Sequence, residues 1–203
     1  MIRVRNDDVM LPSSSYDDGL GRLKQIHAWI CEMPEKFIHV PTILVTEIQE
    51  FPECIEWVRE ETAEGRMLPE IHGLTHMDYA SLTSAEIVLE LRDCKAFILK
   101  EFNHHATKFY TPWGAGADER GKHIRGAAAA VGLEMVTCEH INKMTGRHGV
   151  IQQLMDGRSV DYLDDDEIFM HWWEGGARLK RIIEVAKHGS WVEAVKHNRR
   201  LFR

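Results

Sequence analysis

The feature that most constrains the fold of this chain is the alternation of short apolar segments with longer amphipathic ones. The short segments are rich in apolar and β-branched residues and are typical of strands; they cover residues 1–5, 36–45, 67–73, 107–114, 133–138 and 167–173. The longer segments carry apolar residues at helical spacing; they cover residues 19–33, 52–65, 82–102 and 118–132. Strands that alternate with helices indicate βαβ units and a parallel sheet.

Local signals set the expected ends of these elements. Pro52 near the start of one helix and Gly65 just past its end follow the usual asymmetry of helix termini. Thr83 and Glu86 form the sequence pattern of a capping box. Pro41 lies inside an expected strand and suits a bulge or an edge better than a central position. No Pro-, Gly- or Ser-rich linker divides the chain, so we expect a single domain over residues 1–203.

Composition excludes some classes of partner. Lys and Arg number 25 against 32 Asp and Glu, a formal net charge of −7, whereas nucleic-acid binding needs clustered positive charge. No stretch approaches the roughly 18 apolar residues of a membrane span, and no signal peptide is visible, so we expect a cytoplasmic protein. The cysteines, interpreted as reduced core residues with a catalytic thiol as the alternative, are Cys31, Cys54, Cys94 and Cys138.

Polar residues gather where the expected strands end. In a parallel barrel the carboxyl ends of the strands meet on one face, where active sites lie. The residues at these ends are Asp7, Asp8, His72, His76, Thr111–Gly114 and His171. Their agreement in position therefore predicts one functional site.

The individual pieces each allow two interpretations. His72 and His76 could approach one metal ion together, and a carboxylate would complete the three protein ligands of catalytic zinc; two surface histidines are the alternative. Asp7 and Asp8, as neighbours on a strand, should point to opposite sides, so that one could bind metal while the other faces a cleft. A solvated acidic turn would also explain this pair.

The aromatic residues near the last strand are equally open. His171 lies on an apolar strand beside two tryptophans, which is typical of a core histidine. Trp113, Trp172 and Trp173 could pack in the core or form a platform for a sugar ring.

Four motifs, in order along nearly the whole chain, resemble those of the polysaccharide deacetylase (NodB-like, carbohydrate esterase family 4) superfamily. An apolar strand ending in two aspartates is similar to "RVRNDDV", and a histidine pair before a helix is similar to "EIHGLTHMDYASLTSAEI". The third and fourth motifs resemble "FYTPWG" and "IFMHW". The fold that this resemblance implies is a distorted (β/α) barrel with about seven parallel strands.

The resemblance also implies a metal site. Asp8, His72 and His76 would bind a divalent metal, with Zn²⁺ as the favoured ion. Such an ion supplies a nucleophile by lowering the pKa of a water from 15.7 towards roughly 7, and it polarises a carbonyl.

Further roles follow from the same resemblance. Asp7 would be the general base, and His171 the general acid that protonates the leaving amine. The backbone amide of Trp113 would help to hold the oxyanion, with Tyr110 and Trp172 on the substrate side.

The chain departs from the superfamily at two places. Tyr110 stands where the third motif has an arginine that orients and charges the base; Arg3 and Arg5 are candidate substitutes. The superfamily's further Asp-rich strand end is not visible, and Glu139 or His140 in "VTCEHINK" could take its place.

These observations favour a metal-dependent hydrolase that removes an N-acetyl or N-formyl group from a carbohydrate or related small amide. The expected cytoplasmic location favours a small substrate over a cell-wall polymer. A related amide or imide hydrolase acting on a non-sugar substrate is the first alternative, and a non-catalytic carbohydrate-binding relative is the second. The sequence leaves the oligomeric state open.

Overall fold

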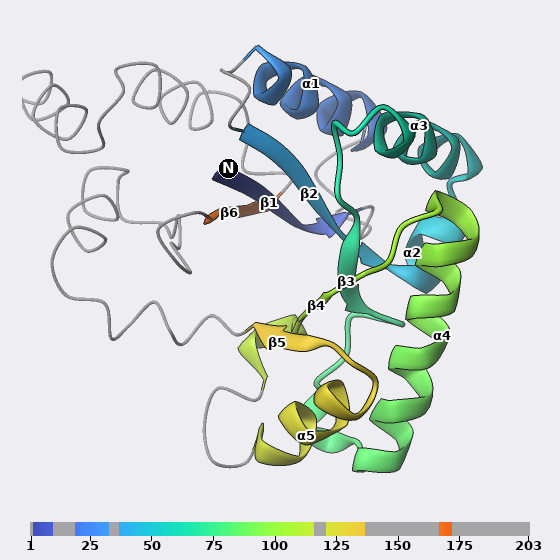
Figure 1. Ribbon diagram of the computed structural model, residues 1–203, viewed down its shortest axis with the longest axis vertical. Coiled ribbons are helices and arrows are strands. Elements are labelled where there is room, and N and C mark those ends of the chain that lie inside the picture. The colour runs from blue at the N-terminus through green and yellow to red at the C-terminus, as the bar shows by residue number, and fades with distance from the viewer. Residues whose placement is uncertain (1, 10–18, 33–36, 116–120, 137–166, 172–203) are drawn as a thin grey trace, which may run out of the picture.

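The computed structural model describes residues 2–9, 19–32, 37–115, 121–136 and 167–171 (Figure 1). Its strands are β1 (Ile2–Val9), β2 (Phe37–Leu44), β3 (Glu70–Gly73), β4 (Lys108–Tyr110), β5 (Glu134–Val136) and β6 (Glu167–His171). They pair in parallel in a six-stranded sheet of order β5-β4-β3-β2-β1-β6. The predicted α/β class with a parallel sheet is confirmed, whereas barrel closure and a seventh strand stay predictions.

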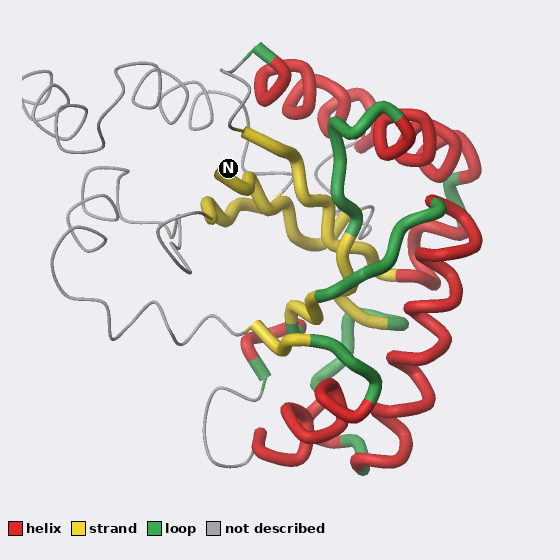
Figure 2. The backbone as a smooth tube through the Cα atoms, viewed as in Figure 1, coloured by secondary structure: helices red, strands yellow, loops and turns green. Residues whose placement is uncertain are grey.

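Helices cover one side of this sheet (Figure 2). They are α1 (Gly19–Cys31), α2 (Val45–Gln49), α3 (Pro52–Ala63), α4 (Ser84–Phe102) and α5 (Lys122–Ala130). The helices expected over residues 19–33, 52–65, 82–102 and 118–132 are confirmed, but the short α2 directly after β2 was not expected. Among the described residues, no helix is both long enough and apolar enough to cross a membrane.

The predicted helix ends match the backbone. Pro52 is the first residue of α3, and Gly65 follows that helix with a positive φ of 72°. At the start of α4, the Thr83 side chain accepts from the Glu86 amide, while the Glu86 carboxylate accepts from the Thr83 amide at 2.8 Å. Both halves of the capping box are therefore present.

The expectation of an edge position for Pro41 was wrong. Strand β2 lies between β1 and β3, so Pro41 belongs to a central strand. The bulge alternative fits better, because Asn6–Pro41 is the last regular pair before a register shift between Asn6 and Val9. An irregularity of this kind is where a central strand tolerates a residue that lacks an amide hydrogen.

The core lies between the sheet and the helices. Its fully buried side chains come from both layers and include Val58, Ile71, Ile87, Leu91 and Phe109.

Two cysteines belong to this core. Cys54 and Cys94 are buried with free thiols, and burial raises the pKa of Cys54 to about 12. Cys31, by contrast, is exposed, which corrects the expectation that it is a core residue. Cys138 lies outside the described residues.

A candidate metal centre at the carboxyl ends of the strands

Asp8, His72 and His76 meet at one edge of the sheet, as predicted. Asp8 is near the end of β1, His72 is on β3, and His76 is in the loop that follows β3. The Asp8 Oδ1 atom lies 2.8 Å from His72 Nε2 and 3.0 Å from His76 Nε2. The three ligand atoms lie within 4.8 Å of one another, and Asp8 and His72 are buried. Among the described residues, this is the one group of three such side chains close enough to share a metal ion.

The hydrogen bond of His72 indicates which groups the centre offers to a ligand. Its Nδ1 lies 2.7 Å from the Tyr110 carbonyl oxygen, which can only accept a hydrogen bond, so Nδ1 carries the hydrogen. In the neutral imidazole, Nε2 then presents a lone pair to the Asp8 carboxylate, which is itself an acceptor. A cation between these groups resolves the conflict, and one carboxylate with two imidazoles is a zinc-type donor set.

The electrostatics of Asp8 point the same way. Burial opposes ionisation, but the close contacts of the carboxylate with His72 and His76 outweigh it and hold the pKa of Asp8 well below its ordinary value; a cation between these groups would act in the same direction. The carboxylate is therefore ionised and ready to act as a ligand.

The backbone at Asp8 is unusual. Its φ is 57°, in the left-handed region that few residues other than glycine adopt. This turn falls within the register shift between Asn6 and Val9, so simple strand alternation does not set the direction of the Asp8 side chain.

Two contacts hold the loop that carries His76. On one side, the Leu74 amide donates to the Tyr79 hydroxyl at 3.0 Å. Gly73 has a φ of 149°, and a Cβ there would lie 2.8 Å from that hydroxyl oxygen. On the other side, the His76 amide donates to Glu47 Oε1 at 3.4 Å. Sequence reasoning missed Glu47, although its place just after β2 puts it at the same edge of the sheet.

Asp7, the predicted base, is buried beside a cation. Its Oδ1 accepts from the Thr42 hydroxyl at 2.8 Å and lies 3.0 Å from Arg5 Nε. The Arg5 guanidinium carbon lies 4.5 Å from the centre of the Tyr110 ring, which is itself buried. The backbone also brings His171 to this edge, since it pairs with Asp7 across β1 and β6.

The remaining site predictions fare differently. Trp113 is 75% exposed, so a core position for it is wrong, and its ring centroid lies 4.6 Å from that of His76. Trp172 and Trp173 lie outside the described residues, as do Glu139 and His140. The roles of Asp7, His171, Tyr110 and Trp113 in a reaction stay predictions.

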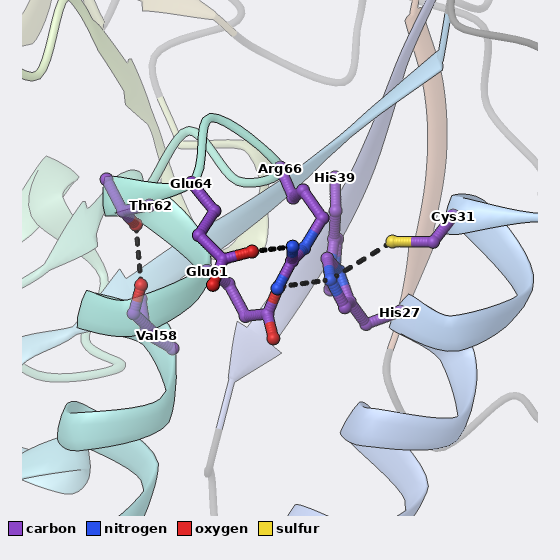
Figure 3. Close-up of polar contacts among 8 residues, drawn as sticks. All are labelled: His27, Cys31, His39, Val58, Glu61, Thr62, Glu64 and Arg66. Carbon is purple, nitrogen blue, oxygen red and sulfur yellow. Dashed lines mark hydrogen bonds and ion pairs between the residues drawn. The ribbon is translucent and has the colours of Figure 1, made fainter.

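A second polar cluster lies where α1 and α3 approach β2 (Figure 3). His27 of α1 places its Nδ1 3.1 Å from the Nδ1 of His39 on β2 and its Nε2 3.0 Å from Glu61 Oε2 on α3. Cys31 Sγ is 3.2 Å from the same Nε2, and Arg66 also pairs with Glu61. Because the guanidinium already pairs with the Glu61 oxygen, this cluster is less suited to a metal ion than the centre at the strand ends.

Comparison with known proteins defines the fold. No protein-family model and no curated protein matches the chain. Among solved structures, a family 4 carbohydrate esterase from Streptomyces lividans in complex with acetate matches with a TM-score of 0.60 at 18% identity, over 93% of this chain and 88% of that one. The Bc1960 peptidoglycan N-acetylglucosamine deacetylase matches with a TM-score of 0.58 at 16% identity, over 92% of this chain and 81% of that one.

A third similar structure is described as a pseudoenzyme. It is a carbohydrate esterase family 4 protein from Bacillus anthracis, with a TM-score of 0.63 and 12% identity. The match covers 93% of this chain but 61% of the longer protein. The chain therefore has the NodB-like polysaccharide deacetylase fold of the carbohydrate esterases, and that fold accommodates both active and inactive proteins.

Proposed function

We propose that this protein is a metal-dependent hydrolase that removes an N-acetyl or N-formyl group from a carbohydrate or a related small amide. The observation that carries the proposal is the group of Asp8, His72 and His76, of which the first two are buried, with Asp7 next to it in the chain. These three residues would hold a divalent cation, with Zn²⁺ favoured by the two imidazoles. The ion would supply a Lewis acid for the acyl oxygen and would acidify the attacking water.

The residues around the ion would move the protons. Asp7 would accept the proton of the attacking water, and the Oδ1 contacts to Thr42 and Arg5 leave its Oδ2 to do so. His171, paired with Asp7 across the sheet, would donate a proton to the leaving amine. A positioned base and acid typically contribute about 10²–10⁴-fold each. The amide of Trp113 would hold the developing oxyanion, a contribution of roughly 3–4 kcal/mol.

The exposed ring of Trp113 supports a carbohydrate substrate. A large aromatic face next to His76 offers apolar area against a sugar ring. Tyr110 and Trp172 complete the substrate side in this proposal. A cytoplasmic location, with no nucleic-acid or membrane partner, stays a prediction.

A second candidate is a non-catalytic carbohydrate-binding protein on the same fold. Tyr110 occupies the position of a motif arginine, and one of the similar structures is described as a pseudoenzyme. The complete Asp-His-His group favours the enzyme.

Metal content measured by mass spectrometry tests the proposal first. Wild type should bind about one equivalent of zinc or a similar ion, and His72→Ala/His76→Ala should lose it. His105→Ala, which removes an exposed histidine elsewhere, is the matched control and should keep the metal. Wild type that takes up no metal when zinc is supplied would refute the metal centre.

A substrate panel then tests the reaction. Metal-loaded wild type should release acetate or formate from N-acyl sugars. Hydrolysis of non-sugar amides or imides alone would favour the alternative of an amide or imide hydrolase that acts on a non-sugar substrate. Metal-loaded protein that hydrolyses nothing but binds sugars would favour the non-catalytic candidate.

A further inference from the structure

A buried arginine and the predicted base share one strand. Arg5 and Asp7 are separated by one residue on β1, so their side chains point to the same face. Arg5 is 1% exposed and Asp7 is 4% exposed, and Arg5 Nε lies 3.0 Å from Asp7 Oδ1. Thr42 on the neighbouring strand donates to the same oxygen at 2.8 Å. The carboxylate is thus held from two directions.

Packing alone gives little reason for a buried cation here. Moving an ion pair out of water costs several kcal/mol per ion, and well-packed apolar residues of similar volume often stabilise a protein as well or better. Arg5 is nevertheless among the largest fully buried side chains of the chain. A buried pair of this kind next to a metal centre is better explained by what it does to Asp7.

Tyr110 contacts the arginine from β4, although β2 and β3 lie between β4 and β1 in the sheet. The guanidinium lies over its ring, 4.5 Å from the centroid, in the geometry of a cation–π contact. The carbonyl of the same residue accepts the hydrogen bond from His72. Tyr110 therefore links the metal ligand to the cation beside Asp7, through its backbone and its side chain respectively.

We propose that Arg5 is the positioning residue of Asp7, with the Tyr110 ring as its platform. The cation that the motif resemblance places at position 110 is supplied from β1 instead. Arg5 acts through Asp7 and does not touch the reacting atoms. This inference rests on the proposed function, because Asp7 needs positioning only if it takes part in the reaction.

Three point variants of the full chain, each loaded with zinc, test this inference. Arg5→Met should lower kcat by about 10–100-fold, the usual effect of removing a partner that orients a site residue, while KM stays within about twofold. Arg5→Lys should recover part of kcat, since lysine keeps the charge but lacks the planar fork. Arg3→Met, on the same face of β1 and two residues further from the site, is the matched control and should keep wild-type kcat. All three should bind as much zinc as wild type.

A relocated arginine separates positioning from folding. Arg5→Met/Tyr110→Arg should recover at least tenfold of the kcat lost in Arg5→Met, because it returns a guanidinium to Asp7 from β4. Wild-type kcat in Arg5→Met would overturn the inference. A second result would also overturn it: Arg5→Met loses zinc or its native circular dichroism, and Arg5→Lys keeps wild-type kcat. Arg5 would then serve folding only. Zinc-loaded wild type that hydrolyses nothing would instead overturn the proposed function, and this inference with it.

Discussion

Acid should destabilise this protein through His39, and replacing His39 with leucine should remove much of that sensitivity. His39 is completely buried on β2, and its Nε2 has no hydrogen-bond partner among the described residues. Its Nδ1 lies 3.1 Å from His27 Nδ1 (Figure 3). Because Glu61 keeps the His27 hydrogen on Nε2, His27 Nδ1 can accept from His39 Nδ1. A second proton on His39 would therefore have to bind at Nε2, where the described residues offer no acceptor. The folded protein must therefore keep this imidazole neutral.

The size of the effect follows from proton linkage. Burial, and secondarily the neighbouring His27, holds the pKa of His39 well below its ordinary value of 6.5. Below pH 6.5 the unfolded state therefore binds more protons than the folded state, and stability falls as pH falls. The loss is about 1.4 kcal/mol per pH unit, or about 2 kcal/mol between pH 6.5 and pH 5. His27 adds to it in the same direction, since burial lowers its pKa against the opposing pull of Glu61.

Urea unfolding between pH 5 and pH 7.5 measures this loss. His39→Leu should lose about 2 kcal/mol less than wild type over that range, which corresponds to a difference of about 4–8 °C in Tm. Chelator in every sample removes the contribution of bound metal, and His105→Leu, at an exposed histidine, should follow wild type. Parallel pH profiles for wild type and His39→Leu would refute the reasoning, because the buried imidazole would then not be the proton-linked group.

Other predictions concern the site. Asp7→Asn should keep the metal but lose turnover by about 10²–10⁴-fold, because only the base is removed; full activity would exclude Asp7 from that role. Chelating the metal should lower Tm by roughly 8–16 °C if free zinc had stood at about 1,000 times Kd, and an unchanged Tm would contradict tight binding. Tyr79→Phe should cost about 1–3 kcal/mol in urea unfolding and weaken zinc binding, because it leaves the Leu74 amide without its partner. Trp113→Gly should raise KM for a sugar substrate with little change in stability, since its ring is 75% exposed; an unchanged KM would exclude the ring from binding.

The sequence was sufficient to predict that Asp8, His72 and His76 lie together, because their meeting depends on the order of strands and helices. Strand and helix periods differ, so the order of elements can be read along the chain. Once the sheet is known to be parallel, residues that follow different strands must meet at one edge. More than sixty residues of sequence separate Asp8 from His72. The side chains of Asp8, His72 and His76 nevertheless meet, as this rule requires.

Side-chain direction and burial were less predictable, because they depend on tertiary packing. The sequence offered Arg3 and Arg5 as substitutes for a missing arginine, and the side-chain positions in the structure show that Arg5 contacts Asp7. Cys31 lies on the exposed side of α1 even though its neighbours in sequence are apolar. The short helix after β2, which carries Glu47, has too few residues for any periodic signal.

Strained backbone conformations occur at the candidate metal site. Among the described residues other than glycine, three have positive φ, and two of them, Asp8 and Trp113, belong to the candidate site. Such conformations cost of order 1–3 kcal/mol each and persist where the surroundings over-determine them. At Asp8 the left-handed turn lets a carboxylate near the end of β1 reach two histidines from β3 and its loop. At Trp113 it accompanies an exposed ring beside His76. Strained residues thus lie on both sides of the pair His72 and His76. Such strain is expected where the core stabilises the fold and the carboxyl ends of the strands are shaped to bind a ligand.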